Sequence, residues 1–134
     1  LRVDADFSAG QASMREVTDA LLAFKKNSGK EVIAYGNGYT QKGLFIAAAA
    51  DKVYMNPEGI ALIEGLGRVR AYYKTALDNL GVTVNVFRVG KYKSFAEPYL
   101  LDGPSDASKE ADSHWMNDVW DRQLVDFGAM RKIL

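Results

Sequence analysis

The sequence contains no cysteine, so it can form neither a disulfide framework nor a thiolate metal site. Histidine is almost as scarce, because His114 is the one imidazole, which argues against a Ser-His-Asp triad and against a metal site built from several histidines. The 17 basic residues balance 17 acidic ones, and this zero net charge gives no support to nucleic-acid binding. We therefore predict a chain without a metal, a cofactor or a nucleic-acid partner.

Also lacking are an initiator methionine, a signal peptide and a transmembrane run. The first residues, L-R-V-D-A-D-F, look like a strand entered midway, and the last, A-M-R-K-I-L, stop without a tail. We interpret the chain as a fragment, which leaves room for a membrane anchor elsewhere in the parent protein. Since 134 residues with 48% apolar and 25% charged residues are typical of one globular unit, residues 1–134 are predicted to form a single domain.

The first part of the chain alternates strand and helix patterns. The S-x-x-E spacing of Ser13 and Glu16 is typical of a capping box, and it predicts a helix that ends near residues 27–29. Short strands at residues 1–4 and 32–35 flank this helix, so the three elements are predicted to form a parallel βαβ unit. The apolar face of the helix is predicted to contain Val17, Ala20, Leu21 and Phe24.

A glycine-containing turn, Gly36-Asn37-Gly38, follows the second strand and precedes a small-residue helix at residues 41–50. Phosphate-binding loops occupy such a position, but both of their usual spacings fail. A dinucleotide fingerprint requires glycine where Gln41 stands, and a P-loop requires lysine where Leu44 stands. Nucleotide binding is therefore not predicted, and the alanine run at 47–50 is interpreted as close packing of the helix against a sheet.

Further strands are predicted at residues 51–55 and 60–63, and a helix then ends at Gly81. The last helix, at about residues 105–132, is predicted to be the longest, with Ser105 as its N-cap. Its apolar stripe is wider than one neighbour covers, which indicates a partner surface in addition to its own core. The apolar positions of the helix that ends at Gly81 are Val69, Tyr72, Tyr73, Ala76, Leu77 and Leu80. Those of the last helix are Trp115, Met116, Val119, Trp120, Leu124, Phe127 and Met130.

Residues 83–89 are predicted to form a strand that delivers Lys91 and Lys93 into a loop closed by Pro98. The carboxyl end of a strand is where open α/β sheets usually keep their chemistry. The pattern alone does not choose between the two lysines, and by itself it favours a solvated loop for both of them. Burial would lower the pKa of Lys93 far enough for a base, and three aromatic residues near it offer apolar surface. These residues are Tyr92, Phe95 and Tyr99.

The segment F-R-V-G-x-Y-K-S-x-x-E-P, together with the order of elements before it, resembles the amino-terminal repeat of the signal peptide peptidase A (protease IV) family in its long, tandem-repeat form. The resemblance implies a Clp protease/crotonase-like α/β fold, a spiral of β-β-α units with a long C-terminal helix. It also implies a Ser-Lys serine endopeptidase in which Lys93 is the general base and the carboxy-terminal repeat supplies the serine. The implied substrates are cleaved signal peptides, and the implied setting is the periplasmic face of the bacterial inner membrane, in a homo-oligomer.

The chain departs from the catalytic repeat of that family at two places. The nucleophile motif has serine before two glycines, whereas Gln41-Lys42-Gly43 stands here, and the Pro-Gly-Gly oxyanion loop is replaced by D-F-S-A-G-Q. The resemblance therefore implies half of an active site, inactive by itself. Thr40 and Ser94 are the hydroxyls near the relevant turns, and Ser94 is interpreted as orienting the lysine amine.

Two alternatives remain open at this point. The chain could be a non-catalytic scaffold or oligomerisation repeat of the same fold, in which case activity of the full-length protein would survive Lys93→Ala. It could also be a crotonase-type enzyme that binds acyl-CoA, which calorimetry with a CoA thioester would reveal.

Overall fold

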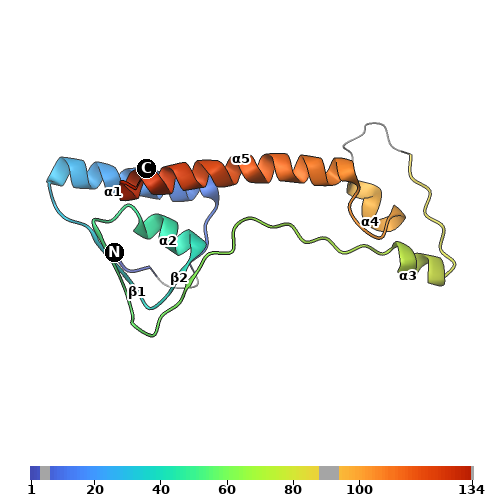
Figure 1. Cartoon of the computed structure of the whole chain (residues 1–134), viewed down its shortest axis with the longest axis horizontal. Coiled ribbons are helices and arrows are strands. Elements are labelled where there is room, and N and C mark those ends of the chain that lie inside the picture. The colour runs from blue at the N-terminus through green and yellow to red at the C-terminus, as the bar shows by residue number, and fades with distance from the viewer. Residues whose placement is uncertain (4–6, 88–93, 134) are drawn as a thin grey trace. The chain divides into compact units, whose positions relative to one another are not determined.

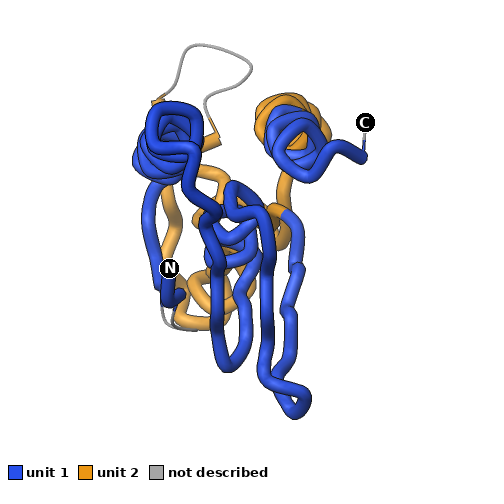
Figure 2. The backbone as a smooth tube through the Cα atoms, turned by 90° about the vertical axis from the view of Figure 1, so that its left-hand side faces the viewer, with its two compact units in different colours: residues 1–65, 122–134 blue, residues 66–121 orange. Residues whose placement is uncertain are grey.

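The computed structural model describes residues 1–3, 7–87 and 94–133, which form two compact units (Figure 2). Unit 1 comprises Leu1–Gly65 and Arg122–Leu134, and unit 2 comprises Leu66–Asp121. Along unit 1, helices are interspersed with short strands that pair in parallel, which confirms the α/β class. The spiral of β-β-α units stays a prediction.

Unit 1 contains the strands and two complete helices, and the C-terminal residues of α5 (Asp106–Arg131) complete it. Figure 1 shows α1 and the end of α5 on the same side of the strands. The other elements of this unit are α1 (Gln11–Ser28), β1 (Ile33–Gly36), β2 (Tyr39–Thr40), α2 (Gln41–Ala47), β3 (Lys52–Met55) and β4 (Ala61–Leu62).

The strand pairs are parallel, as the βαβ pattern predicts. Strand β1 pairs with β3 from Ile33 opposite Lys52 to Gly36 opposite Met55. On its other edge, β1 receives the N-terminal segment, because Arg2 forms a parallel bridge with Tyr35. The second pair joins β2 to β4 in the same parallel sense. The predicted strands at 32–35, 51–55 and 60–63 are thus confirmed to within a few residues.

Small side chains allow α2 to approach the strands closely. Residues 47–50, the predicted alanine run, are all buried. Ala47 and Ala50 share one core cluster with Ala34 of β1 and with Tyr39 of β2. A second cluster forms around Phe45 on the other face of α2. It is made of Met14, Phe45 and Ile46, with Leu21 and Met130 packed against it.

Helix α1 corrects two predictions. It begins at Gln11 with Gly10 as an N-cap that makes no side-chain bond, so Ser13 lies inside the first turn and the predicted capping box is wrong. The buried face is also different, because Met14 and Thr18 are buried whereas Phe24 is about half exposed. The Thr18 hydroxyl donates to the Arg15 carbonyl oxygen at 2.9 Å, and this hydrogen bond lets a polar residue occupy the face that packing selects.

Unit 2 contains α3 (Lys74–Asn79), a 3₁₀ turn η1 (Ser94–Ala96), α4 (Glu97–Leu100) and most of α5. Helix α3 is much shorter than predicted, since Val69 and Tyr72 lie outside it and Val69 is fully exposed. The Tyr73 amide donates to the Pro98 carbonyl oxygen at 2.6 Å. Tertiary contacts of this kind hold the chain before α3 outside the helix, against its helical spacing.

The strand predicted at residues 83–89 is not formed over its described part, residues 83–87, where Phe87 is fully exposed. A strand is stable when a neighbour pairs its backbone N–H and C=O groups, and the described residues offer no such neighbour here. Residues 88 and 89 lie outside the described part of the chain.

Helix α5, with 26 residues, is the longest among the described elements, and its N-cap is the predicted one. The Ser105 Oγ accepts a hydrogen bond from the Ser108 amide at 3.2 Å. Trp115 and Leu124 of the predicted stripe are each about half exposed. Within the described ranges, no helix combines the length and the hydropathy needed to cross a membrane.

Candidate functional site

The candidate base Lys93, and Lys91 beside it, lie outside the described residues. The described chain resumes at Ser94, which opens η1, and α4 follows directly with Pro98 in its first turn. Proline suits this place because its fixed φ fits the start of a helix and its missing N–H is not needed there. The described residues nearest to Lys93 in the chain are therefore those that follow it, from Ser94 onwards.

Three contacts anchor this C-terminal side within unit 2. The Arg70 guanidinium donates to the Ser94 carbonyl oxygen at 3.0 Å, and the Tyr73 amide donates to the Pro98 carbonyl oxygen. The rings of Tyr73 and Tyr99 stack with centroids 6.0 Å apart. The segment just before α3 and the segment just after the lysine thus hold each other through backbone and aromatic contacts.

Asp102 adds a fourth contact within unit 2, between α3 and the loop after α4. It accepts hydrogen bonds from the Thr75 hydroxyl at 2.6 Å and from the Thr75 amide at 3.1 Å. The hydroxyl lowers the pKa of the Asp102 carboxyl, and this effect outweighs its partial desolvation. The carboxylate is therefore the form that fixes the start of α3 to the loop after α4.

The aromatic residues predicted to surround the lysine do not form an apolar wall in the described part of the chain. Phe95 is 83% exposed, and Tyr99 is about half exposed although it stacks on Tyr73. Tyr92 lies outside the described residues. The apolar wall predicted from these aromatic residues is therefore not formed by Phe95 and Tyr99.

At the start of α2, both side chains of interest already have structural roles. The Thr40 Oγ accepts from the Gly43 amide at 3.3 Å and so caps the helix. The Gln41 amide binds the backbone of Gly65 at both ends: Oε1 accepts from the Gly65 N–H at 2.8 Å, and Nε2 donates to the Gly65 carbonyl oxygen at 3.3 Å. Gly65 has φ +76°, which a residue with a Cβ rarely adopts.

The described part of the D-F-S-A-G-Q loop leads into α1. Gly10 is the N-cap of that helix, and its carbonyl oxygen accepts from the Met14 amide at 3.0 Å. Ser8 is exposed, and its Oγ accepts a hydrogen bond from the Lys42 Nζ at 3.2 Å. Lys42 is thus the donor in this bond, whereas a general base would accept the proton of the serine hydroxyl.

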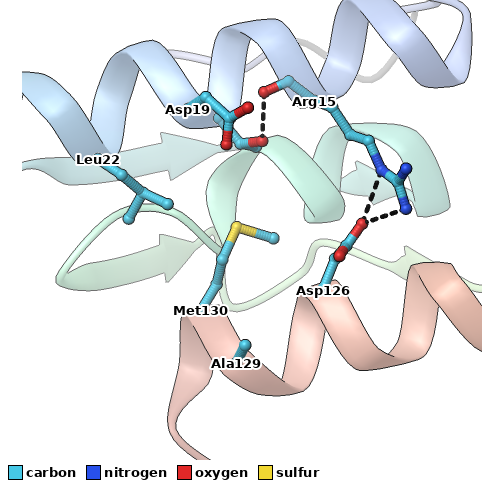
Figure 3. A pocket seen from close by; sticks show the side chains of 7 residues that line it. Arg15, Asp19, Leu22, Asp126, Ala129 and Met130 are labelled. Atoms are coloured by element: carbon cyan, nitrogen blue, oxygen red, sulfur yellow. Dashed lines mark hydrogen bonds and ion pairs between the residues drawn. The ribbon is translucent and has the colours of Figure 1, made fainter.

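A cavity of about 330 Å³ lies between α1 and the end of α5 in unit 1 (Figure 3). Arg15 and Asp126 form an ion pair on its wall, with Arg15 Nε 2.8 Å from the carboxylate. Figure 3 shows the Met130 side chain reaching towards α1 between the two helices. The one hydroxyl in its lining belongs to Thr18 and donates its hydrogen bond to the Arg15 carbonyl oxygen. We therefore do not assign a nucleophile to this cavity.

A second cavity, of about 260 Å³, lies in unit 2 beside the anchor of the lysine segment. Arg70 lines it and also donates to Ser94, whereas Arg68 lines it and pairs with Asp112 at 2.6 Å. The described residues contain no cluster of three or more histidine, aspartate or glutamate side chains placed to hold a metal ion.

The sequence reasoning missed two features, one in each unit. Glu97, buried in α4, could have been singled out because a Glu-Pro pair opens the helix that follows the lysine. The pairing of Gln41 with Gly65 carries no such signal, because the two residues are 24 positions apart and belong to different predicted elements.

Comparison with known proteins identifies the class. Residues 24–134 match Peptidase family S49, and the chain belongs to this family. Protease 4 of Salmonella typhi is 42% identical over 125 residues, and Protease 4 of Haemophilus influenzae is 38% identical over 108 residues. The chloroplastic serine protease SPPA of Arabidopsis thaliana is 24% identical over 117 residues. These alignments cover 93%, 81% and 87% of this chain but 20%, 18% and 17% of the relatives, so the chain spans about a fifth of their length.

Proposed function

We propose that the chain is the lysine-donating repeat of a serine endopeptidase, with Lys93 as the general base and the nucleophilic serine outside this chain. The observation that carries the proposal is the 42% identity to a Protease 4 over 93% of the chain, in a sequence that includes the lysine motif. The contacts at the start of α2 support it, because Gln41 and Thr40 both hold backbone groups there.

The reaction divides into acylation and deacylation of the serine, and each half needs Lys93 to take up a proton and to give one back. Neutral Lys93 takes the proton from the serine hydroxyl as the oxygen attacks the peptide carbonyl carbon, and the resulting ammonium then gives a proton to the departing amine. Lys93 next takes a proton from water as the water oxygen attacks the acyl carbon, and the ammonium returns this proton to the serine oxygen as the ester bond breaks, which releases the acid and the free serine. A lysine that is neutral near pH 7 instead of at its ordinary pKa of about 10.4 needs about 4 to 5 kcal/mol of desolvation.

The wider setting is part of the same proposal. We propose cleaved signal peptides as substrates and the periplasmic face of the bacterial inner membrane as the location. The half-exposed apolar residues of α5, Trp115 and Leu124, are proposed to contact a carboxy-terminal repeat of the same protein or another copy of it in a homo-oligomer.

A serine-directed fluorophosphonate tests the division of labour in the full-length protein. Phosphonylation, followed by peptide mapping, is expected to place the label on a serine outside residues 1–134. The isolated chain is expected to remain unlabelled and to hydrolyse no peptide ester. A label on Thr40 or Ser94 would contradict the proposal and would make this chain a nucleophile donor.

Restoring a serine at the start of α2 is expected to be insufficient for activity. In the isolated chain, Gln41→Ser should give no measurable turnover, because the loop at Ser8 lacks the adjacent glycine amides of an oxyanion site. Loss of one oxyanion donor typically reduces the rate by about a hundred- to a thousandfold. Ester hydrolysis by Gln41→Ser, compared with Gln41→Ala as the matched control, checks this. Robust turnover in the serine variant alone would show that the loop is competent.

A further inference from the structure

Glu97 is buried to a degree unusual for a charged residue. Only 1% of its surface is exposed, and within the described ranges it is the one buried residue with a carboxylate. Removing such a group from water is unfavourable unless hydrogen bonds hold it in place. The position of Glu97, four residues after Lys93, gives this burial a bearing on the proposed reaction.

Glu97 joins α4 to the beginning of α5. The Ser105 hydroxyl donates to Oε1 at 2.6 Å, and the Ser105 amide donates to Oε2 at 3.2 Å. The same Ser105 Oγ accepts from the Ser108 amide, so one serine is bound to the carboxylate and caps the helix at once. Both oxygens of the carboxylate are therefore bound by the N-cap residue of α5, a helix of 26 residues.

The residues between Lys93 and Glu97 are held by the same frame. Ser94 is bound through its carbonyl oxygen by Arg70, and Ala96 is buried. Pro98, the next residue after Glu97, accepts the 2.6 Å hydrogen bond from Tyr73. Each of these contacts restrains the chain that directly follows the lysine, and Glu97 is the charged residue among them.

We infer that Glu97 is a positioning residue for the general base, acting through the Ser105 cap of α5. The inference rests on the proposed function of Lys93. A base must lie within hydrogen-bond reach of the serine proton, and a displacement of about 1 Å reduces the rate by about a hundredfold. In this scheme Glu97 acts on the base through Ser105, which donates a hydrogen bond to each of its two oxygens.

The test uses Glu97→Gln in the full-length protein. The amide keeps the size of the side chain, but it carries no charge and only its oxygen accepts, so one of the two hydrogen bonds from Ser105 must be lost or reversed. We expect kcat to fall by about ten- to a hundredfold while KM changes by less than about twofold, because substrate contacts remain. The rate of fluorophosphonate labelling of the serine should fall by the same factor as kcat.

Three further variants separate positioning from simple loss of stability. Ser105→Ala removes the hydroxyl and should reproduce the kcat loss, whereas Ser105→Thr keeps the hydroxyl and should retain kcat. Asp112→Asn breaks the Arg68 ion pair in the same unit and should leave kcat unchanged. If Glu97→Gln does not fold, the comparison of Ser105→Ala with Ser105→Thr decides the inference.

The two proposals fail differently. Wild-type kcat in both Glu97→Gln and Ser105→Ala, with Lys93→Ala inactive, would overturn the role of Glu97 and leave the proposed function intact. Full activity of Lys93→Ala would overturn the proposed function, and with it the basis for a positioning role of Glu97. A kcat loss in Asp112→Asn equal to that in Glu97→Gln would also overturn the inference, because stability alone would explain both.

Discussion

Lys93→Ala is expected to reduce peptide hydrolysis by the full-length protein by about a thousandfold, the scale on which a positioned general base contributes. An alanine cannot accept the serine proton, so the nucleophile would remain a weakly reactive hydroxyl. In the wild type, activity should rise with pH as the lysine ammonium loses its proton, and then level off. This acid limb should disappear in the alanine variant. The measurement is kcat for a fluorogenic peptide ester across pH.

Two matched variants distinguish a base from a positive charge. Lys93→Arg should be as inactive as Lys93→Ala, because a guanidinium keeps its charge but stays protonated at working pH. Lys91→Ala, two residues earlier in the chain, should retain most of the activity. Substantial activity in Lys93→Arg would favour an electrostatic role, and loss of activity in Lys91→Ala would move the assignment to that lysine.

Phe45→Ala is expected to lower the free energy of unfolding of the isolated chain by about 3 to 5 kcal/mol. Phe45 is 1% exposed and packs with Met14 and Ile46 in the cluster on which Leu21 and Met130 also pack. Since small proteins are stable by only about 5 to 15 kcal/mol, this single cavity would consume much of the margin. Urea denaturation followed by circular dichroism measures the change.

Phe87→Ala provides the matched control for the size and type of substitution. Phe87 is fully exposed, so its truncation should change the free energy of unfolding by less than about 0.5 kcal/mol. Destabilisation by Phe87→Ala as large as that expected for Phe45→Ala would contradict the exposure of Phe87. It would indicate that Phe87 is covered in solution.

Local chemistry made several elements predictable. The β-branched and aromatic residues of β1 and β3, and the glycine and proline between β3 and β4, were sufficient for strands placed to within a few residues. Ser105 was recognised as an N-cap because its hydroxyl serves an amide only three positions away. The lysine motif was likewise found from a contiguous run of residues, which is why family membership could be recognised from sequence.

What depended on distant partners could not be predicted. The buried face of α1 is the one on which Met14 packs against Phe45. Thr18 is therefore buried and Phe24 half exposed, whereas hydropathy alone predicts the reverse. The non-helical chain before α3 is held by Pro98, which lies 25 positions after Tyr73. No local pattern encodes either contact, and propensity alone favoured the wrong result in both cases.

The order of the chain in unit 1 has a consequence for how the protein is made. Its first part ends at Gly65, but the residues that complete it begin at Arg122. Its closing hydrogen bonds, Gln11 to Gln123 and Arg15 to Asp126, join residues 112 and 111 positions apart. Contacts of such separation form late, because loop closure must precede them. On the ribosome, the residues of unit 2 therefore emerge before unit 1 can close, and stalled chains that end before Arg122 should expose the apolar surface around Met14 and Phe45 to chaperones.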